Sequence, residues 1–332
     1  MTDYITLSQG NGGRHTQTLI KELIAASLNY PPDTLLDAAP LHSLRQPLLM
    51  TTDSFTVQPL EFPGGSIGSL AIHGTVNDLA VAGAKARYLS LAMIIEEGLP
   101  VAQLQRIMAD LAKAVSEADV KIVCGDTKVV PSGQASGLYL NTTGIGEKYV
   151  QATLGMEQIQ PGDKIICSGT LGDHGAAVLM AREAFGLSSQ LPSDSANVFP
   201  LVEVIAALDG LRFMRDPTRG GLSCVIHEIH QATALGLQIE QEKLPLRPEV
   251  GSFCQILGLE PWYLASEGRI IAIVAADQAD ELLRRWQHLP QGQQASIIGS
   301  VSDTSHLPVL CTPLGGKRLL PPLEDDPLPR IC

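Results

Sequence analysis

The stretch that decides the fold is FPGGSIGSLAIHGTVNDLAVAGA (residues 62–84), a glycine-rich loop that opens into an apolar helical pattern. RYLSLAMII (87–95) follows and predicts a buried strand, because the run is short, apolar and bounded by polar residues. The composition of the chain, with 4% aromatic residues, 31 glycines and 22 prolines, suits an α/β or α+β enzyme with many tight turns.

The sequence on either side predicts the rest of a first domain. Apolar residues at helical spacing predict a helix over 16–28, and LLMTTDS (48–54) predicts a strand that runs into an acidic turn. VAQLQRIMADLAKAVSEA (101–118) carries one apolar face and predicts a helix. Further strands are expected over 120–127, ending at an aspartate, and over 137–147.

A second domain is expected after the turn-rich stretch at 150–163. A strand–turn–helix unit is predicted over 164–185, and RDPTRGG (215–221) is a glycine loop that leads into a helix. A strand, a helix and a strand then close the domain. The predicted organisation is a first domain of residues 1–150, a second of 151–320 and a tail of 321–332.

The tail, PPLEDDPLPRIC (321–332), is rich in proline and ends on Cys332. Proline prevents a helix here and favours an extended chain, which spans up to ~40 Å over twelve residues. Cys332 does not fit a prenylation signal, in which the cysteine stands fourth from the end. A functional role for the Cys332 thiol therefore depends on whether the rest of the chain supplies residues that can react with it.

Composition excludes several classes of protein. The chain has 332 residues, 45% of them hydrophobic, and a formal charge of −12 without a basic stripe, which argues against nucleic-acid binding. The N-terminus lacks the pattern of a secretory signal, and the apolar runs are too short to cross a bilayer. We therefore expect a cytoplasmic protein that binds neither nucleic acid nor membrane.

Three aspartates, Asp53, Asp78 and Asp126, are expected where strands end or helices begin. In a parallel-type architecture such ends gather at one edge of the sheet, where α/β proteins build their sites. Oxygen ligands that converge there suit Mg²⁺ held partly by carboxylates and partly by nucleotide phosphates. Each aspartate alone also fits a helix N-cap or a turn, so the indication comes from their occurrence together beside Gly64 and Gly65.

The glycine loop itself is a candidate phosphate site, because backbone N–H groups at a helix start form an anion nest. A conventional P-loop is excluded since no GxxxxGK[ST] occurs, and no GxGxxG supports a dinucleotide fold. The six cysteines include no CxxC pair, so no zinc spacing exists. His174, in GDHG, is expected to lie in a turn.

Three further residues have both a functional and a plain interpretation. Lys128 either places a cation on a transferring phosphoryl group or is a surface lysine at a strand end. Glu267, in ASEGRI, is either a base or metal ligand or an exposed turn glutamate. Asp216 either closes a site from the second domain or caps the helix that follows.

Taken in order, these motifs resemble one family. The motifs that carry the resemblance are TTDS, FPGGSIG, ND, GDTKVV, SGTLGDHG, DPTRGG, SEG and the terminal PRIC. The chain resembles the HypE family of hydrogenase-maturation carbamoyl dehydratases. The wider superfamily is that of aminoimidazole ribonucleotide synthetase and selenophosphate synthetase. The resemblance runs from GNGG (10–13) to the last residue, and GDTKVV together with the PRIC terminus is its most specific part.

The resemblance implies a two-domain α+β fold whose N-terminal domains pair in a homodimer through a shared β-barrel, with ATP bound near that interface. It also implies that Cys332 receives a carbamoyl group from HypF and that ATP drives its dehydration to a thiocyanate. The cyano group would then pass to the HypC–HypD complex and become a ligand of the [NiFe] hydrogenase active site.

Residue roles follow from the same resemblance. Nucleotide and phosphate contacts are expected from Gly64, Gly65, Asn77, Asp78, Asp126, Thr127 and Asp216. Mg²⁺ ligands are expected from Asp53, Asp78 and Asp126. The catalytic residues would be Cys332, Lys128 and Glu267, with Glu267 as the base and Lys128 as its alternative. Two other functions stay open: an ATP-dependent kinase or ligase of this superfamily acting on a metabolite, which would not need Cys332, and a non-enzymatic carrier of a cysteine-bound group.

Overall fold

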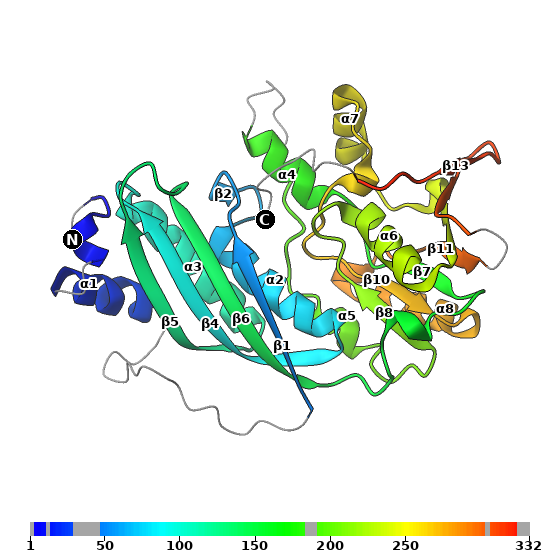
Figure 1. Ribbon diagram of the computed structural model, residues 1–332, viewed down its shortest axis with the longest axis horizontal. Helices are drawn as coiled ribbons and strands as arrows, with labels where there is room; N and C mark the ends of the chain where they lie inside the picture. Colours follow the sequence, from blue (N-terminus) through cyan, green and yellow to red (C-terminus); the bar gives the residue numbers. More distant parts are fainter. Residues whose placement is uncertain (1–2, 11–13, 29–46, 183–190, 303–305, 324–332) are drawn as a thin grey trace.

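The computed structural model describes residues 3–10, 14–28, 47–182, 191–302 and 306–323. Two α/β units lie side by side, each built on its own sheet (Figure 1). The predicted helix over 16–28 is found as α1 (Arg14–Leu19), which continues into a π-helical turn η2 (Ile20–Ala25). A short 3-10 helix η1 (Leu7–Gly10) precedes it.

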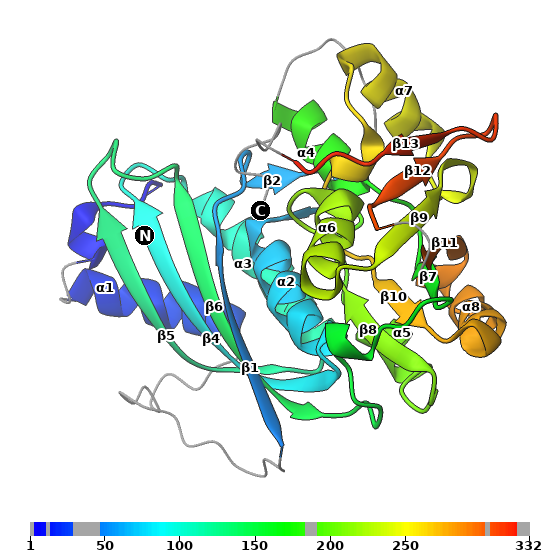
Figure 2. The ribbon, with the colours of Figure 1, turned by 45° about the vertical axis from the view of Figure 1, so that its right-hand side comes forward.

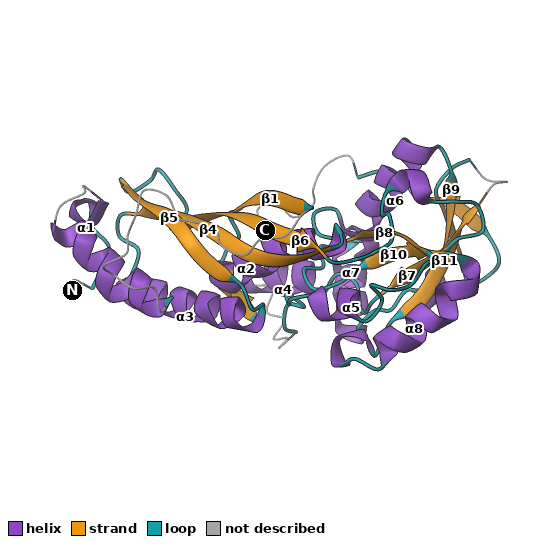
Figure 3. Ribbon diagram, turned by 90° about the horizontal axis from the view of Figure 1, so that it is seen from below, coloured by secondary structure: helices purple, strands orange, loops and turns teal. Residues whose placement is uncertain are grey.

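The first unit is a sheet of four strands in the order β1–β6–β4–β5. The helices α2 (Ile67–Val81) and α3 (Val101–Glu117) lie on one face of this sheet, and none of the described helices covers the other (Figure 3). The elements are β1 (Leu48–Phe55), β2 (Glu61–Phe62), β3 (Gly65–Ser66), α2 (Ile67–Val81), β4 (Ala84–Glu96), α3 (Val101–Glu117), β5 (Lys121–Val130) and β6 (Leu138–Lys148).

The strand directions correct the expectation of a parallel-type architecture. Only β4 and β5 run parallel, whereas β1–β6 and β6–β4 are antiparallel. Strand ends therefore do not gather at one edge, and Asp126 lies in the middle of β5, four residues before its end. Asp78 lies in the last turn of α2 instead of at a helix start. Within the described chain this sheet stays open, with β1 and β5 as its edges.

The second unit is a sheet of seven strands in the order β13–β12–β9–β11–β7–β10–β8. Its strands are β7 (Lys164–Cys167), β8 (Leu211–Arg215), β9 (Gly236–Glu240), β10 (Ile271–Val274), β11 (Ser296–Ser302), β12 (Val309–Cys311) and β13 (Lys317–Leu319). Its helices are α4 (Asp173–Arg182), α5 (Phe199–Glu203), α6 (Gly221–Thr233), α7 (Pro248–Leu257) and α8 (Ala279–Gln287).

Helices on both faces explain the continuous apolar run at β10. Ile271 and Ile273 pack in the hydrophobic cluster that includes α6, and Ala272 and Val274 pack in the cluster that includes α8. A strand buried on both faces needs apolar residues at every position. The described chain contains no helix with the length and apolar character that crossing a membrane requires.

Helix α2 joins the two units. All of its residues except Asp78 are buried, so it has no polar face to turn toward solvent. It packs on the first sheet at β1 and β6, and on α5 and β8 of the second unit. Figure 2 shows α2 between the first sheet and the second unit. Side chains near its end therefore meet residues of both units.

Candidate active site

A pair of carboxyl groups lies where β1 meets the end of α2. Asp53 and Asp78 are close enough for their side chains to share a hydrogen bond. Thr51 Oγ1 donates a hydrogen bond of 2.8 Å to Asp78 Oδ2. Burial raises the pKa of Asp53 to about 6, the charge of Asp78 adds to this rise, and Arg219 opposes it. Asp53 therefore holds a proton more readily than an ordinary aspartate does.

The second unit adds two acids to this pair. Burial raises the pKa of Asp216 to about 7, with further contributions from Asp78 and Asp53. Burial also raises the pKa of Glu267 well above its usual range, and the neighbouring acids Asp216, Asp194, Asp53 and Asp78 raise it further. Asp53, Asp78, Asp216 and Glu267 thus sense one another's charge, and we call these four residues the acidic cluster.

Glu267 is the most enclosed member of the acidic cluster. Its side chain is only 2% exposed. Its Oε1 finds no hydrogen-bond partner among the residues that the structure describes. The interpretation of Glu267 as an exposed turn glutamate is therefore wrong, and the carboxyl group is available to a proton or to a ligand that enters the cluster.

Asn77 holds the backbone beside Glu267. Its side-chain amide donates to the carbonyl oxygens of Glu267 at 3.0 Å and of Ala196 at 2.9 Å. Its Oδ1 accepts from the backbone N–H of Val198 at 2.9 Å. Asn77 thus lies between two segments of the second unit, and the nucleotide contact predicted for it stays a prediction.

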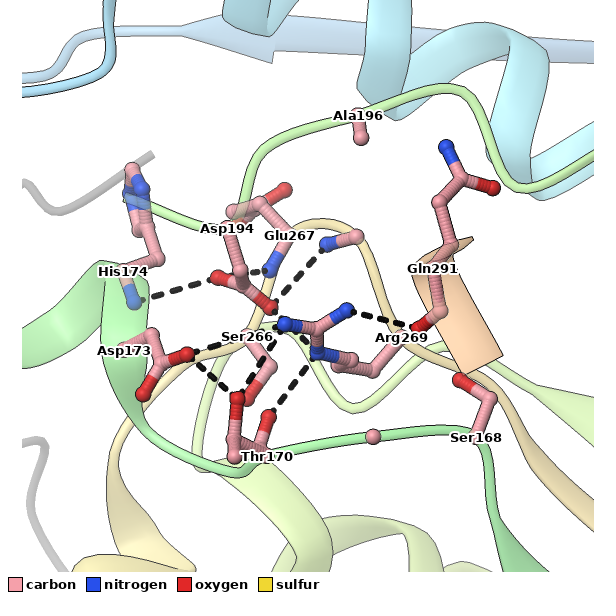
Figure 4. A network of polar contacts seen from close by, with 12 residues as sticks. Ser168, Thr170, Asp173, His174, Asp194, Ala196, Ser266, Glu267, Arg269 and Gln291 are labelled. Atoms are coloured by element: carbon pink, nitrogen blue, oxygen red, sulfur yellow. Dashed lines mark hydrogen bonds and ion pairs between the residues drawn. The ribbon is translucent and has the colours of Figure 1, made fainter. Parts of the chain in front are cut away.

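Asp194 holds the same segment from the other side (Figure 4). Its Oδ1 accepts from the backbone N–H groups of Glu267 at 3.2 Å and of His174 at 3.1 Å. Arg269 Nε lies 3.3 Å from Asp194 Oδ2 and neutralises its charge. A Cβ on Gly268 would lie 1.9 Å from the Asp194 carbonyl oxygen, so the SEG motif needs glycine for this close approach.

Arg269 also connects the SGTLGDHG segment (168–175) with the SEG segment (266–268). Arg269 Nε donates to the carbonyl oxygen of Thr170 at 2.9 Å, and its Nη2 lies 3.6 Å from Asp173 Oδ2. Asp173 is also paired with Arg247 at 3.0 Å. His174, predicted in a turn, is fully buried in the first turn of α4. The sequence analysis did not predict roles for Asp194 and Arg269, because no local motif indicates that two residues so far apart along the chain form an ion pair.

The glycine loop contacts the same second-unit segment. Gly64 has φ +93°, and a Cβ there would lie 2.8 Å from the backbone nitrogen of Ser193. The N–H of Ser193 donates to the Pro63 carbonyl oxygen at 2.7 Å. A Cβ on Gly65 would lie 2.7 Å from Ser69 Oγ. Packing therefore accounts for both glycines, whether or not a phosphate binds nearby.

Asp126, Thr127 and Lys128 lie on β5, at the opposite edge of the sheet from β1. Asp126 and Lys128 are exposed, on the sheet face that α2 does not cover. Three strand spacings separate β1 from β5, which is about 14 Å. One chain therefore does not bring these three residues to the acidic cluster. Cys332 lies outside the described residues.

The donor set fits a magnesium ion that binds together with a nucleotide. In the part of the chain that the structure describes, no group of three or more His, Cys, Asp or Glu residues is arranged to hold a metal. Mg²⁺ commonly takes one or two protein carboxylates and completes its shell with phosphates and water. The Asp53–Asp78 pair supplies such a partial shell, and Asp216 lies near enough to act on both electrostatically.

Comparison with known proteins agrees with this architecture. Residues 36–147 match the N-terminal domain and residues 160–311 the C-terminal domain of AIR synthase related proteins. The two matches, together with the two-unit fold, identify the chain as a two-domain AIR synthase related protein. Thiamine monophosphate kinase of Aquifex aeolicus shares the fold, with a TM-score of 0.60 at 19% identity.

Closer relatives narrow this class. The chain is 43% identical to the carbamoyl dehydratase HypE of Azotobacter vinelandii over 331 residues, covering 99% of this chain and 97% of the relative. Identity to the Escherichia coli K12 carbamoyl dehydratase HypE is 39% over 334 residues, covering 99% of each chain. The chain belongs to the HypE family of hydrogenase maturation proteins.

Solved structures of relatives match nearly the whole chain. A HypE in complex with ATP superposes with a TM-score of 0.93 at 42% identity, covering 98% of this chain and 99% of that one. The HypE of a HypE–HypF complex superposes with a TM-score of 0.81 at 41% identity, covering 92% and 99%.

Proposed function

We propose that this chain uses ATP to dehydrate a carbamoyl group on its own Cys332 to a thiocyanate, which supplies the cyano ligand for [NiFe] hydrogenase maturation. The names of its relatives support carbamoyl dehydration, and the ATP complex of a relative supports the nucleotide. The observation that carries the proposal is Glu267, a buried carboxyl group of raised pKa beside an acid pair suited to Mg²⁺.

The proposed reaction balances as one S-carbamoyl group and one ATP giving one thiocyanate, one ADP and one phosphate. The amide nitrogen gives up both of its protons, one to Glu267 and the other to the released phosphate or to water. MgATP, when bound, supplies the phosphoryl group that lets the carbonyl oxygen leave as phosphate. Glu267 accepts a proton from the nitrogen, and the burial that raises its pKa makes its carboxylate a stronger base than an exposed glutamate.

The other members of the acidic cluster have electrostatic roles in this proposal. Asp53 and Asp78 hold Mg²⁺, and Asp216 adds negative charge from the second unit. Arg219 acts on Asp53 with the opposite sign and is a candidate to meet the nucleotide phosphates. HypF is proposed as the carbamoyl donor, with support from the HypE–HypF complex of relatives, and HypC–HypD as the cyanide acceptor.

We also propose that two copies pair through the uncovered face of the first sheet (Figure 3). Met50 on β1 and Ile94 on β4 are 70% and 41% exposed there, and contact with a second copy would remove both from water. Pairing would also place Asp126 and Lys128, which lie on this face, in the contact between the two copies.

Light scattering tests the pairing. Ile94→Glu should halve the molar mass in solution, because a charge on this face costs free energy when the face is covered. Ile256→Glu is the matched control, since Ile256 is 65% exposed on α7, away from the first sheet, and its variant should keep the wild-type mass. A wild-type protein that is monomeric while it dehydrates its tail would contradict the proposal.

Intact mass spectrometry tests the reaction. After incubation with HypF, carbamoyl phosphate and ATP, the peptide ending at Cys332 should gain a carbamoyl group, which then loses one water when MgATP is added. Cys332→Ala should fold and bind ATP but show no adduct. ATP consumption on a small molecule without any adduct would instead support a metabolite enzyme, and an adduct that never loses water would support a carrier.

A further inference from the structure

The last described residues, Leu320–Leu323, form the root of the tail and are fixed to the second unit. Leu320 follows β13, is 4% exposed and packs in the same hydrophobic cluster as α6. Its N–H donates to the Pro308 carbonyl oxygen at 3.1 Å. Pro321 and Pro322 have no N–H and cannot extend the β13 ladder, so carbonyl oxygens are the backbone groups that can still be held.

Three side chains hold the carbonyl oxygens of the root. Tyr263 Oη and Ser223 Oγ donate to the Pro321 oxygen at 2.9 and 3.3 Å. His227 Nε2 lies 2.9 Å from the Leu320 oxygen and donates to it. Ser223 and His227 are four residues apart on α6 and so share one face, while Tyr263 comes from the 3-10 helix η6 (Pro261–Tyr263).

The root lies next to the segment that supplies the acidic cluster. Leu323 Cδ2 is 3.1 Å from the position of a Cβ on Gly220, the residue that precedes α6. Arg219, which precedes Gly220, acts electrostatically on Asp53, and Asp216 lies four residues before Gly220. In Figure 2 the segment after β13 runs back past α6.

The nine residues after the root are enough chain to carry Cys332 from the root to the acidic cluster. The nine residues 324–332 follow the root and extend over about 30 Å at most. A tethered group reacts at an effective concentration that depends on tether length and on where the tether starts. Proline stiffens the chain, so the direction in which the tail leaves its root also matters.

We propose that Ser223, His227 and Tyr263 form a tail clamp, which fixes the start of the tail beside the acidic cluster and so presents Cys332 to it. They are positioning residues for the tethered substrate. This inference rests on the proposed dehydration at Cys332. Loss of the clamp moves the fixed start of the tail back toward β13, which lengthens the tether and frees its direction.

The test compares the tethered substrate with the same substrate supplied free. Ser223→Ala with Tyr263→Phe removes both hydrogen bonds to Pro321 and keeps the aromatic ring. The tethered reaction is single-turnover water loss from the carbamoylated full-length chain, followed by mass. The free reaction uses a Cys332→Ala chain with a synthetic peptide of residues 324–332 that carries S-carbamoylcysteine.

The double variant should slow the tethered reaction about threefold or more and leave the free reaction unchanged, since the free peptide lacks the clamped residues. Tyr149→Phe, which removes an exposed hydroxyl bonded to Glu203, is the matched control and should change neither. If the double variant slows both reactions equally, the three side chains only support the structure of the site and the clamp proposal is wrong. If it slows neither reaction, the proposal is also wrong.

Amide hydrogen exchange provides a readout besides activity. Exchange at Leu320, whose N–H is bonded to Pro308, should accelerate in the double variant and stay at the wild-type rate in Tyr149→Phe. Unchanged exchange would mean that Ser223 and Tyr263 do not hold the root, which would overturn the clamp. If the wild-type chain loses water in neither reaction, the proposed function fails, and accelerated exchange would then report a structural contact only.

Discussion

Glu267 is a carboxyl group that the fold encloses among other acids. Its backbone is held from two sides, by Asn77 through the carbonyl oxygen and by Asp194 through the N–H. Its side chain meets Asp216 and the Asp53–Asp78 pair electrostatically. A fixed backbone with an unsatisfied, high-pKa carboxyl group is the arrangement that a general base requires.

Glu267→Gln should therefore slow the step that follows carbamoylation. The amide keeps the size of the side chain and cannot take a proton, so water loss from the carbamoylated chain should slow by ~10²-fold or more. Carbamoylation by HypF and ATP binding should persist. Glu249→Gln, on the exposed start of α7, serves as control. Unchanged water loss in Glu267→Gln would transfer the role of the base to Lys128, which Lys128→Met then tests.

At the scale of elements, α2 sets the spacing of the site. Its consecutive residues Asn77 and Asp78 bind different partners. Asn77 binds the backbone of Glu267, and Asp78 pairs with Asp53 from β1. A rigid helix turn thus fixes Glu267 relative to the acid pair. The complete burial of the rest of α2 leaves it no freedom to shift without unpacking both units.

Asn77→Ala should consequently lower both stability and rate. It leaves the carbonyl oxygens of Ala196 and Glu267 and the N–H of Val198 without their partner, which costs about 2–4 kcal/mol in the free energy of unfolding. Water loss should slow more than ATP affinity weakens. Urea unfolding measures the first effect, with Gln238→Ala, a half-buried amide away from α2, as the control. A stable Asn77→Ala chain of unchanged rate would contradict the positioning role.

Elements with strong periodicity were predictable, and the assembly of the site was not. The helix expected over 101–118 is confirmed as Val101–Glu117, and the strand expected over 48–54 as Leu48–Phe55. The positions of Asp78 and Asp126 were wrong, because the strand directions depend on pairing between distant segments. The short strands β9, β12 and β13 carry too few residues for a clear pattern. The Asp194–Arg269 pair exists only through tertiary contact.

At the scale of the whole molecule, the acidic cluster links stability to pH. The pKa values of Asp53 and Asp216 rise from 3.8 to about 6 and about 7, so the folded state binds more protons than the unfolded state between pH 4 and 7. Stability from these groups therefore falls as the pH rises through this range. His73 acts with the opposite sign, because burial lowers its pKa from 6.5 to about 4. The contribution of an acid to the pH dependence of stability is therefore measured as the difference between a variant of that acid and the wild type, because His73 contributes equally to both.

Asp216→Asn should become more stable relative to the wild type as the pH rises from 4 to 7, by at most ~1.4 kcal/mol per pH unit. The amide cannot ionise, so it avoids the cost of a buried charge beside Asp78 and Asp53. Urea unfolding at half-unit steps of pH, without Mg²⁺ or nucleotide, measures the difference, and Asp277→Asn in an exposed turn is the control. Added MgATP should reduce the difference, because a bound cation stabilises the ionised wild-type cluster. A difference that stays flat with pH would show that Asp216 ionises as an ordinary surface carboxyl group and would remove it from the cluster.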